Sequence, residues 1–316
     1  MILKPYKFKP LLKTVIWGGD KIVAFKGIES ELSLVGESWE LSGVEGHESV
    51  VDGGPDDGLT LSQLIARHGA ELLGERVYRQ HGTRFPLLVK LIDARRNLSV
   101  QVHPDDEMAR REHGCDGKTE MWYVIDHEPG AKIMAGFAQH ITPDDYDRMV
   151  ADGTIMEAVE HHTSRRGQVY FLPAGRIHAI GEGNFIAEIQ QTSDITYRVF
   201  DYNRVDAQGH PRELHTQLAR RALDFADCGR CRPTLGESGT LVQCKYFTVS
   251  KLDVDGCRPL PMPDSCVVMM CVAGQATVVG GSESVASLRQ GQTLLLPATM
   301  TQIALCGQAT LLIACP

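Results

Sequence analysis

The sequence predicts a mainly β protein built from two related β-barrels with a few accessory helices. The chain holds 31 Gly and 15 Pro residues, which separate many short apolar runs as tight turns separate strands. The stretch Gly167-Gln-Val-Tyr-Phe-Leu-Pro-Ala also returns as Gly291-Gln-Thr-Leu-Leu-Leu-Pro-Ala, 124 residues later. A repeat at that distance indicates two copies of one strand-rich unit, and in its register His178 aligns with Gln302.

Two domains follow from this repeat. We expect residues 1–225 to form a metal-binding domain and residues 226–316 to form a smaller β-domain without metal ligands. Residues 1–60 have the alternation and turn signals of strands. Helical insertions are predicted at about 60–80 and at 142–162, because Thr60 and Thr142 each stand where a helix cap belongs.

Two further helices are expected within the first domain. The acidic stretch from Pro104 to Gly114 has helical character, and a longer helix is predicted from Arg212 to Phe225. His161 and His162 fall at the end of the predicted 142–162 helix, where we interpret them as solvated residues rather than ligands.

The charge balance and the cysteines limit the class of protein. A net charge of −8 argues against nucleic acid as a partner, while a small anionic substrate needs only a local cationic pocket. No signal peptide or membrane-length apolar run is evident, so a cytoplasmic protein is expected. We interpret the nine cysteines as reduced thiols, with a redox or zinc role for Cys228 and Cys231 as the alternative.

A row of polar residues on two predicted strands indicates a metal site. In Ser99-Val-Gln-Val-His, period-two alternation places Ser99, Gln101 and His103 on one face. The next strand does the same for Lys118, Glu120 and Trp122. An amide oxygen, an imidazole and a carboxylate that converge in a barrel, joined by His178 from a later hairpin, can hold zinc, and such a set also accepts iron, manganese or cobalt.

Two other stretches carry possible chemistry. The apolar run Phe85-Pro-Leu-Leu-Val-Lys-Leu-Ile-Asp predicts a buried strand, in which Lys90 either reaches out from a strand end or points into a pocket. Gly117-Lys-Thr matches the end of a phosphate-binding P-loop, but the first glycine of that motif would have to stand at position 112, where Glu112 is found, so a kinase or nucleotidase is disfavoured.

Several motifs resemble those of a known superfamily. Gly167-x5-Pro173-x-Gly175-x2-His178 matches the second cupin motif except at its final Asn, where Glu182 stands, and the first motif takes the form Gln101-x-His103 with Glu120 further on. This combination resembles the compact bacterial subgroup of type I mannose-6-phosphate isomerases. The resemblance extends over most of the chain, through Trp17-Gly-Gly, Gly36-Glu-Ser-Trp-Glu, Phe85-Pro-Leu-Leu-Val-Lys, Leu98-Ser-Val-Gln-Val-His-Pro, Gly117-Lys-Thr-Glu-Met-Trp-Tyr, Leu172-Pro-Ala-Gly-x-x-His-Ala-Ile-Gly and Gln191-x-Ser-Asp-x-Thr-Tyr-Arg.

The resemblance implies a reaction and a set of residue roles. The reaction is the reversible interconversion of mannose 6-phosphate and fructose 6-phosphate through an enediol, assisted by one Zn²⁺ per chain. The implied zinc ligands are Gln101, His103, Glu120 and His178. The implied catalytic residues are Arg198, Glu188 and Lys118, and the substrate-binding residues are Lys90, Ser99, Lys118 and Arg198.

Some alternatives stay open at this point. The proton carrier is Glu188, Lys118 or a metal-bound water or hydroxide. A metal-dependent cupin oxygenase and a non-catalytic sugar-phosphate-sensing cupin are the competing functions. The expected partner is a small sugar phosphate, with no nucleic acid and no membrane, and the chain is expected to be a monomer or a homodimer.

Overall fold

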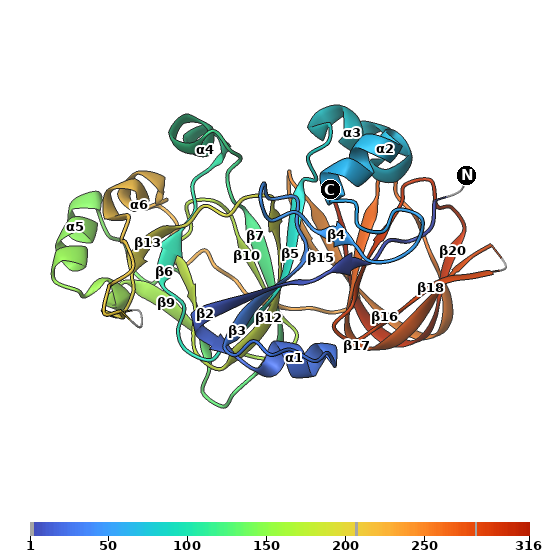
Figure 1. The fold of residues 1–316 in the computed structure, drawn as a ribbon. Coiled ribbons are helices and arrows are strands. Elements are labelled where there is room, and N and C mark those ends of the chain that lie inside the picture. Colours follow the sequence, from blue (N-terminus) through green and yellow to red (C-terminus); the bar gives the residue numbers. More distant parts are fainter. Residues whose placement is uncertain (1–2, 206–207, 282) are drawn as a thin grey trace.

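The computed structural model describes residues 3–205, 208–281 and 283–316. The fold is mainly β with a few helices, which confirms the coarse prediction (Figure 1). Among the described residues, no helix is long and apolar enough to cross a membrane. The helices are α1 (Lys21–Lys26), α2 (Leu61–Leu73), α3 (Glu75–His81), α4 (Asp106–His113), α5 (Pro143–Ala151) and α6 (Thr216–Ala222), with one 3-10 turn, η1 (Ile155–Glu157).

Two sheets face one another in the first part of the chain. One has the strand order β14 (Thr234–Leu235), β10 (Gln168–Leu172), β7 (Glu120–His127), β12 (Asn184–Gln191), β5 (Leu87–Ala94), β3 (Val35–Leu41) and β2 (Leu11–Gly19). The other has the order β13 (Tyr197–Phe200), β6 (Val100–Val102), β11 (His178–Ile180), β8 (Lys132–Phe137) and β9 (Val159–Thr163). Their facing sides share one buried cluster, to which Trp122 of the first sheet and Ile133 and Ile180 of the second contribute.

The C-terminal strands form a third large sheet. Its order is β15 (Gly239–Gln243), β16 (Thr248–Leu260), β20 (Ile303–Cys315), β17 (Val267–Gly280) and β18 (Glu283–Arg289), and β19 (Thr293–Leu296) also pairs with β17. Figure 1 shows these strands, in orange and red, beside the first sheet. A short pair, β1 (Phe8–Lys9) and β4 (Val50–Val51), completes the β structure of the described residues.

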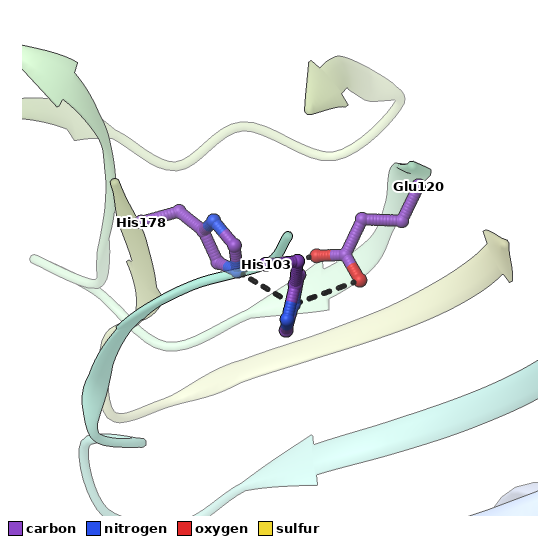
Figure 2. Close-up of side chains that lie close together, drawn as sticks. All are labelled: His103, Glu120 and His178. Atoms are coloured by element: carbon purple, nitrogen blue, oxygen red, sulfur yellow. Dashed lines mark hydrogen bonds and ion pairs between the residues drawn. The ribbon is translucent and has the colours of Figure 1, made fainter. Parts of the chain in front are cut away.

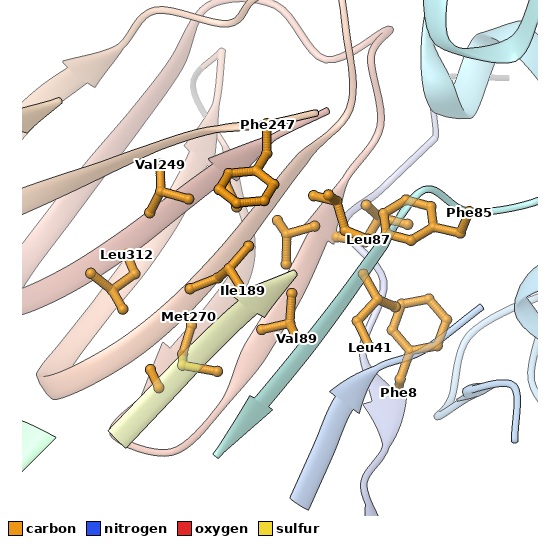
Figure 3. Packing of buried hydrophobic residues seen from close by; sticks show 14 of the residues in the cluster. Phe8, Leu41, Phe85, Leu87, Val89, Ile189, Phe247, Val249, Met270 and Leu312 are labelled. Carbon is orange, nitrogen blue, oxygen red and sulfur yellow. The ribbon is translucent and has the colours of Figure 1, made fainter. Parts of the chain in front are cut away.

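The seven-stranded sheet is the middle layer, because both of its faces are buried. Along β5, Val89 and Leu91 belong to the cluster that packs on the C-terminal sheet, while Ile92 belongs to the cluster between the first two sheets. Figure 3 shows Val89 and Ile189 of the middle sheet against Met270, Leu312 and other side chains of the C-terminal strands. This explains the continuous apolar run around Lys90, since a strand covered on both faces needs apolar residues at alternate positions on each.

The repeat seen in the sequence is a repeated turn in the structure. Gly167 and Gly291 adopt φ values of 80° and 78°, which suit glycine. In both copies the side-chain oxygen of the next residue, Gln168 or Gln292, accepts a hydrogen bond at 3.0 Å from the backbone N–H three residues earlier. The strand that follows pairs antiparallel with β7 in the first copy and with β17 in the second.

Some predicted helices are shorter than expected, and one was missed. The 142–162 insertion is helical only over α5 and η1, and His161 and His162 lie on strand β9, because the segment pairs with β8. The helix predicted over 212–225 is limited to α6. The six-residue helix α1 lies in a region predicted as strands and turns.

The expectation that all cysteines are free thiols is wrong for one pair. Cys257 and Cys306 form a disulfide, because they lie directly opposite one another on β16 and β20. The other seven cysteines are free, among them Cys228 and the buried Cys231.

Candidate metal centre and pocket

Three side chains from separate strands meet at a fully buried point (Figure 2). His103 follows β6, Glu120 opens β7 and His178 opens β11. The Nε2 atoms of the two imidazoles lie 3.1 Å apart. The Glu120 carboxylate lies 3.5 Å from His103 Nε2 and 3.4 Å from His178 Nε2. Among the described residues, this is the group of His, Cys, Asp and Glu side chains that can hold a metal ion.

The hydrogen bonds on the far side of each ring fix the tautomer. Nδ1 of His103 lies 2.9 Å from the Ile195 carbonyl oxygen, and Nδ1 of His178 lies 2.8 Å from that of Arg176. Because a carbonyl oxygen only accepts, each Nδ1 carries the proton and each Nε2 presents a lone pair. Two lone pairs therefore face each other beside the buried Glu120 carboxylate, whose Oε1 lacks a hydrogen-bond partner and whose Oε2 lies 3.0 Å from Lys118 Nζ. A cation between the two nitrogens would remove the repulsion between these lone pairs, so the residues fit a metal.

The electrostatics favour the charge states that a metal requires. Burial, followed by the charge of Lys118, lowers the pKa of His103 to about 3. Burial likewise lowers the pKa of His178. Burial opposes ionisation of Glu120, but Lys118 and His103 outweigh it and hold the pKa of Glu120 well below its ordinary value. Neutral imidazoles and an ionised carboxylate are the ligand forms of these residues.

A cavity of about 320 Å³ opens between the two facing sheets. It brings together Gln101 and all five predicted catalytic and substrate-binding residues, as well as residues that the sequence did not single out. The lining includes Lys90, Ser99, Gln101, Lys118, Glu188 and Arg198. Val100 and Val102 instead pack in the cluster beneath the opposite face of β6, so the predicted alternation of this strand is confirmed.

Gln101 connects the metal group with the cavity. Its backbone pairs with His178 on one side and with Arg198 on the other. Gln101 lines the cavity, whereas the three buried residues of the metal group are not part of its lining. This position is compatible with an amide ligand that faces the substrate, and the role of Gln101 stays a prediction.

Buried charges are paired at one end of the cavity. Lys90 Nζ lies 3.1 Å from Glu188 Oε1 and 3.8 Å from Glu37 Oε2. Burial disfavours the charged lysine, but Glu188 and Glu37 outweigh it and raise the pKa of Lys90. Trp122 Nε1 donates to Glu188 Oε2 at 2.8 Å. Burial and the charge of Glu120 nevertheless raise the pKa of Glu188.

Lys118 bridges the cavity and the metal group. Its Nζ lies 3.0 Å from Glu120 Oε2, and its side chain is only 5% exposed. Lys118 therefore carries its charge to the point where a substrate and a metal would meet.

Arg198 lies on β13 at the opposite wall. Its Nη1 donates to the Glu213 carbonyl oxygen at 2.7 Å, while its buried Nε has no hydrogen-bond partner. Burial, followed by the charge of Arg212, lowers the pKa of Arg198. An unpaired guanidinium N–H beside a second arginine favours an anionic ligand.

The cavity also contains residues that sequence reasoning missed. Glu37, Asp194 and Arg212 line it together with the predicted residues. Glu37 stands within the quoted Gly36-Glu-Ser-Trp-Glu motif, so a signal for it was present. No sequence motif pointed to Arg212, because its position in the cavity depends on a bidentate ion pair with Asp201.

Fold and site together define a class: a metal-binding β protein whose metal group adjoins a pocket for a small polar, anionic ligand. Residues 6–138 match the family described as "Phosphomannose isomerase type I, catalytic domain", and residues 237–316 match "Mannose-6-phosphate isomerase, cupin domain". The mannose-6-phosphate isomerase ManA of Bacillus subtilis (strain 168) is 34% identical over 99% of each chain. The chain belongs to the type I mannose-6-phosphate isomerase family.

Other comparisons agree with this membership. A mannose-6-phosphate isomerase of Streptococcus mutans is 35% identical over 90% of each chain. The crystal structure of the mannose 6-phosphate isomerase from Bacillus subtilis superposes with a TM-score of 0.88, at 31% identity over 99% of each chain.

Proposed function

We propose that this chain interconverts mannose 6-phosphate and fructose 6-phosphate. One observation carries the proposal: the facing Nε2 atoms of His103 and His178 lie beside Glu120, which Lys118 connects with a polar cavity. Family membership supplies the identity of the sugar phosphate, since the relatives carry the name mannose-6-phosphate isomerase.

We further propose that Gln101, His103, Glu120 and His178 hold one Zn²⁺. The buried pair of facing lone pairs beside the Glu120 carboxylate supports a cation, and imidazole, carboxylate and amide ligands suit zinc, iron, manganese and cobalt alike. When bound, the metal would supply Lewis-acid polarisation of substrate oxygens.

Glu188 is our candidate for the proton carrier between C1 and C2. Trp122 donates to its Oε2 and Lys90 lies 3.1 Å from its Oε1, so the carboxylate is held in place in the cavity wall. A carboxyl group whose pKa is raised suits proton transfer nearer neutral pH than an ordinary glutamate. In the aldose-to-ketose direction Glu188 would take the proton from C2, leaving an enediolate, and return it to C1.

The remaining cavity residues would bind the sugar phosphate and neutralise the negative charge on it. Lys118 would donate to the substrate oxygen that becomes negative in the enediolate. Arg198 would stabilise negative charge on the enediolate or the phosphate through its guanidinium group, since the residue lines the cavity. Lys90 and Ser99 would orient the sugar phosphate in the cavity.

For the whole chain we propose two cupin-type jelly-roll barrels, a catalytic domain over residues 1–225 and a C-terminal domain over 226–316 without metal ligands. The repeated turn at Gly167 and Gly291 supports this duplication. We also propose a cytoplasmic enzyme that acts as a monomer or a homodimer.

A coupled assay with mannose 6-phosphate, before and after chelation, tests the function. We expect turnover that chelation abolishes and Zn²⁺ restores. Binding without turnover would instead indicate a sensor, and oxygen consumption at an electrode would indicate an oxygenase. Full turnover in metal-stripped protein would contradict the metal-assisted mechanism.

A further inference from the structure

The C-terminal region contacts the segment that leads into Lys118. Tyr246, in the turn between β15 and β16, donates its hydroxyl to Asp106 Oδ2 at 3.0 Å. Its neighbour Lys245 approaches the same oxygen at 3.4 Å. Asp106 is the first residue of α4, and it stands 140 residues before Tyr246 in the chain.

The other oxygen of Asp106 holds the loop before β7. Asp106 Oδ1 accepts from the Gly117 backbone N–H at 3.1 Å and from Gln191 Nε2 at 3.0 Å. Gln191 Oε1 in turn accepts from the Thr119 backbone N–H at 2.9 Å. The residues on both sides of Lys118 are therefore fixed by side chains that converge on one carboxylate.

The backbone around Lys118 is also tightly packed. The Lys118 backbone N–H donates to the Pro104 carbonyl oxygen at 3.1 Å. A Cβ atom at Gly117 would lie 2.5 Å from the carbonyl carbon of Asp105 and 2.6 Å from the backbone nitrogen of Asp106. The loop thus rests directly on the start of α4, so a shift of Asp106 moves Lys118.

The charge states of Asp106 and Tyr246 strengthen the hydrogen bond between them. Burial opposes ionisation of Asp106, but hydrogen bonds from Gln191, Tyr246 and Gly117 lower its pKa. Burial, together with the hydrogen bond to Asp106, raises the pKa of Tyr246, so its phenol remains a donor. A hydrogen bond between an ionised carboxylate and a neutral phenol is stronger than one between two neutral groups.

We propose that Tyr246 is a positioning residue for the isomerase: through Asp106 and Gln191 it holds Lys118 at the reacting end of the cavity. The C-terminal region would then contribute to turnover although none of its described residues lines the cavity. The catalytic readout of this proposal rests on the proposed function, and a second readout is independent of it.

Steady-state kinetics of Tyr246→Phe test the proposal. We expect kcat to fall about tenfold with KM changed less than about twofold, because small displacements of a catalytic group act on the chemical step. Tyr6→Phe is the matched control, since Tyr6 donates to Asp56 at 2.8 Å in the same buried cluster but away from the cavity. The control is expected to keep wild-type kcat.

A double-mutant cycle separates positioning from general destabilisation. In a Lys118→Met background, Tyr246→Phe should cause no further loss of kcat, because the group that it positions is gone. An equal loss in both backgrounds, or wild-type kcat in Tyr246→Phe alone, overturns the proposal.

Hydrogen exchange supplies the readout that does not depend on activity. The Gly117 and Thr119 amides should exchange about tenfold faster in Tyr246→Phe and at the wild-type rate in Tyr6→Phe. If the wild-type protein fails to convert mannose 6-phosphate, the proposed function fails. The exchange rates still decide whether Tyr246 holds the backbone around Lys118. Unchanged exchange in Tyr246→Phe overturns it.

Discussion

The two copies of the repeated turn share a glycine conformation and two hydrogen bonds but differ in their chemistry. In both, the proline carbonyl oxygen accepts from the backbone N–H three residues on, at 3.2 Å after Pro173 and at 3.0 Å after Pro297. The first copy then presents His178 to the metal group, whereas the second has Gln302 at the same place. The shared hydrogen bonds thus end before the ligand position, where the two copies differ in backbone conformation as well as in side chain.

The neighbouring strand differs in the same way. Leu172 pairs with Glu120 in the first copy, and its counterpart Leu296 pairs with Val267 in the second. Val267 packs in the apolar interior of the C-terminal sheet. A strand pairing that buries a carboxylate in one copy therefore buries a hydrocarbon in the other, which costs far less free energy.

The largest expected effect comes from making the first copy resemble the second. His178→Gln replaces an imidazole nitrogen of the metal group by an amide, which is a weaker ligand on a differently shaped side chain, so we expect loss of bound metal and a fall in kcat of about a thousandfold or more. Metal analysis and the coupled assay measure both. Gln302→Ala is the matched control in the second copy and should change neither. Retention of stoichiometric, tightly bound metal in His178→Gln would contradict the assignment.

Arg198→Ala separates the cavity from the metal group. The metal group does not include Arg198, so metal content should be unchanged, while kcat falls about a hundredfold through loss of charge stabilisation. Arg198→Lys restores the charge without the planar fork and should recover only part of the activity. Wild-type kcat in Arg198→Ala would show that this wall of the cavity is not catalytic.

The pH profile tests Glu188. Its pKa is raised above the ordinary value of 4.5, and a protonated carboxyl cannot accept a proton. Activity should therefore be lost as pH falls, along an acid limb centred above 4.5, and Glu188→Gln should remove the activity. An acid limb at or below the ordinary value, or an active Glu188→Gln variant, would point to another proton carrier.

The two glycines of the repeat provide a stability test. Both have a left-handed φ, so an alanine costs about 1–2 kcal/mol at either position. At Gly291 a Cβ would also lie 2.8 Å from Lys26 Cα, whereas at Gly167 the nearest atom is 3.8 Å away. Gly291→Ala should thus destabilise more than Gly167→Ala by about 1–3 kcal/mol in urea unfolding. Equal losses would mean that the neighbouring helix yields without cost.

The smallest expected effect comes from the reverse exchange. Gln302→His restores one imidazole to the second copy, but Val267 still stands where Glu120 would have to be. We expect the metal content to stay at that of the wild type and kcat to be unchanged. A second bound metal per chain would show that the two copies differ less than their strand pairings indicate.

The sequence predicted the features that follow from local patterns. Alternation placed Ser99 and Gln101 on the cavity face of β6, and the caps at Thr60 and Thr142 both form capping boxes in the structure. Features set by distant pairing could not be predicted this way. Strand β9 forms because it pairs with β8, and the Cys257–Cys306 disulfide follows from the register of β16 on β20.

The same limit applies to the site. The motifs named the residues that the structure brings together, but they gave no distance between the histidines and no partner for Lys118. Arg212 and Tyr246 escaped notice because they lie outside the motifs that carry the resemblance, and their places depend on contacts with Asp201 and Asp106, 11 and 140 residues away in the chain.

The middle sheet has a consequence for how this protein can change. Along β5, the residues that face the C-terminal sheet and those that face the cavity alternate, so each set can be substituted without touching the other. Stability can be adjusted at Leu87, Val89 and Leu91 while Lys90 stays in place. A shift of the strand by one residue, however, would exchange the two sets, placing a lysine against the C-terminal sheet and leucines in the cavity. Tolerance to substitution and intolerance to insertion should therefore coexist in this strand.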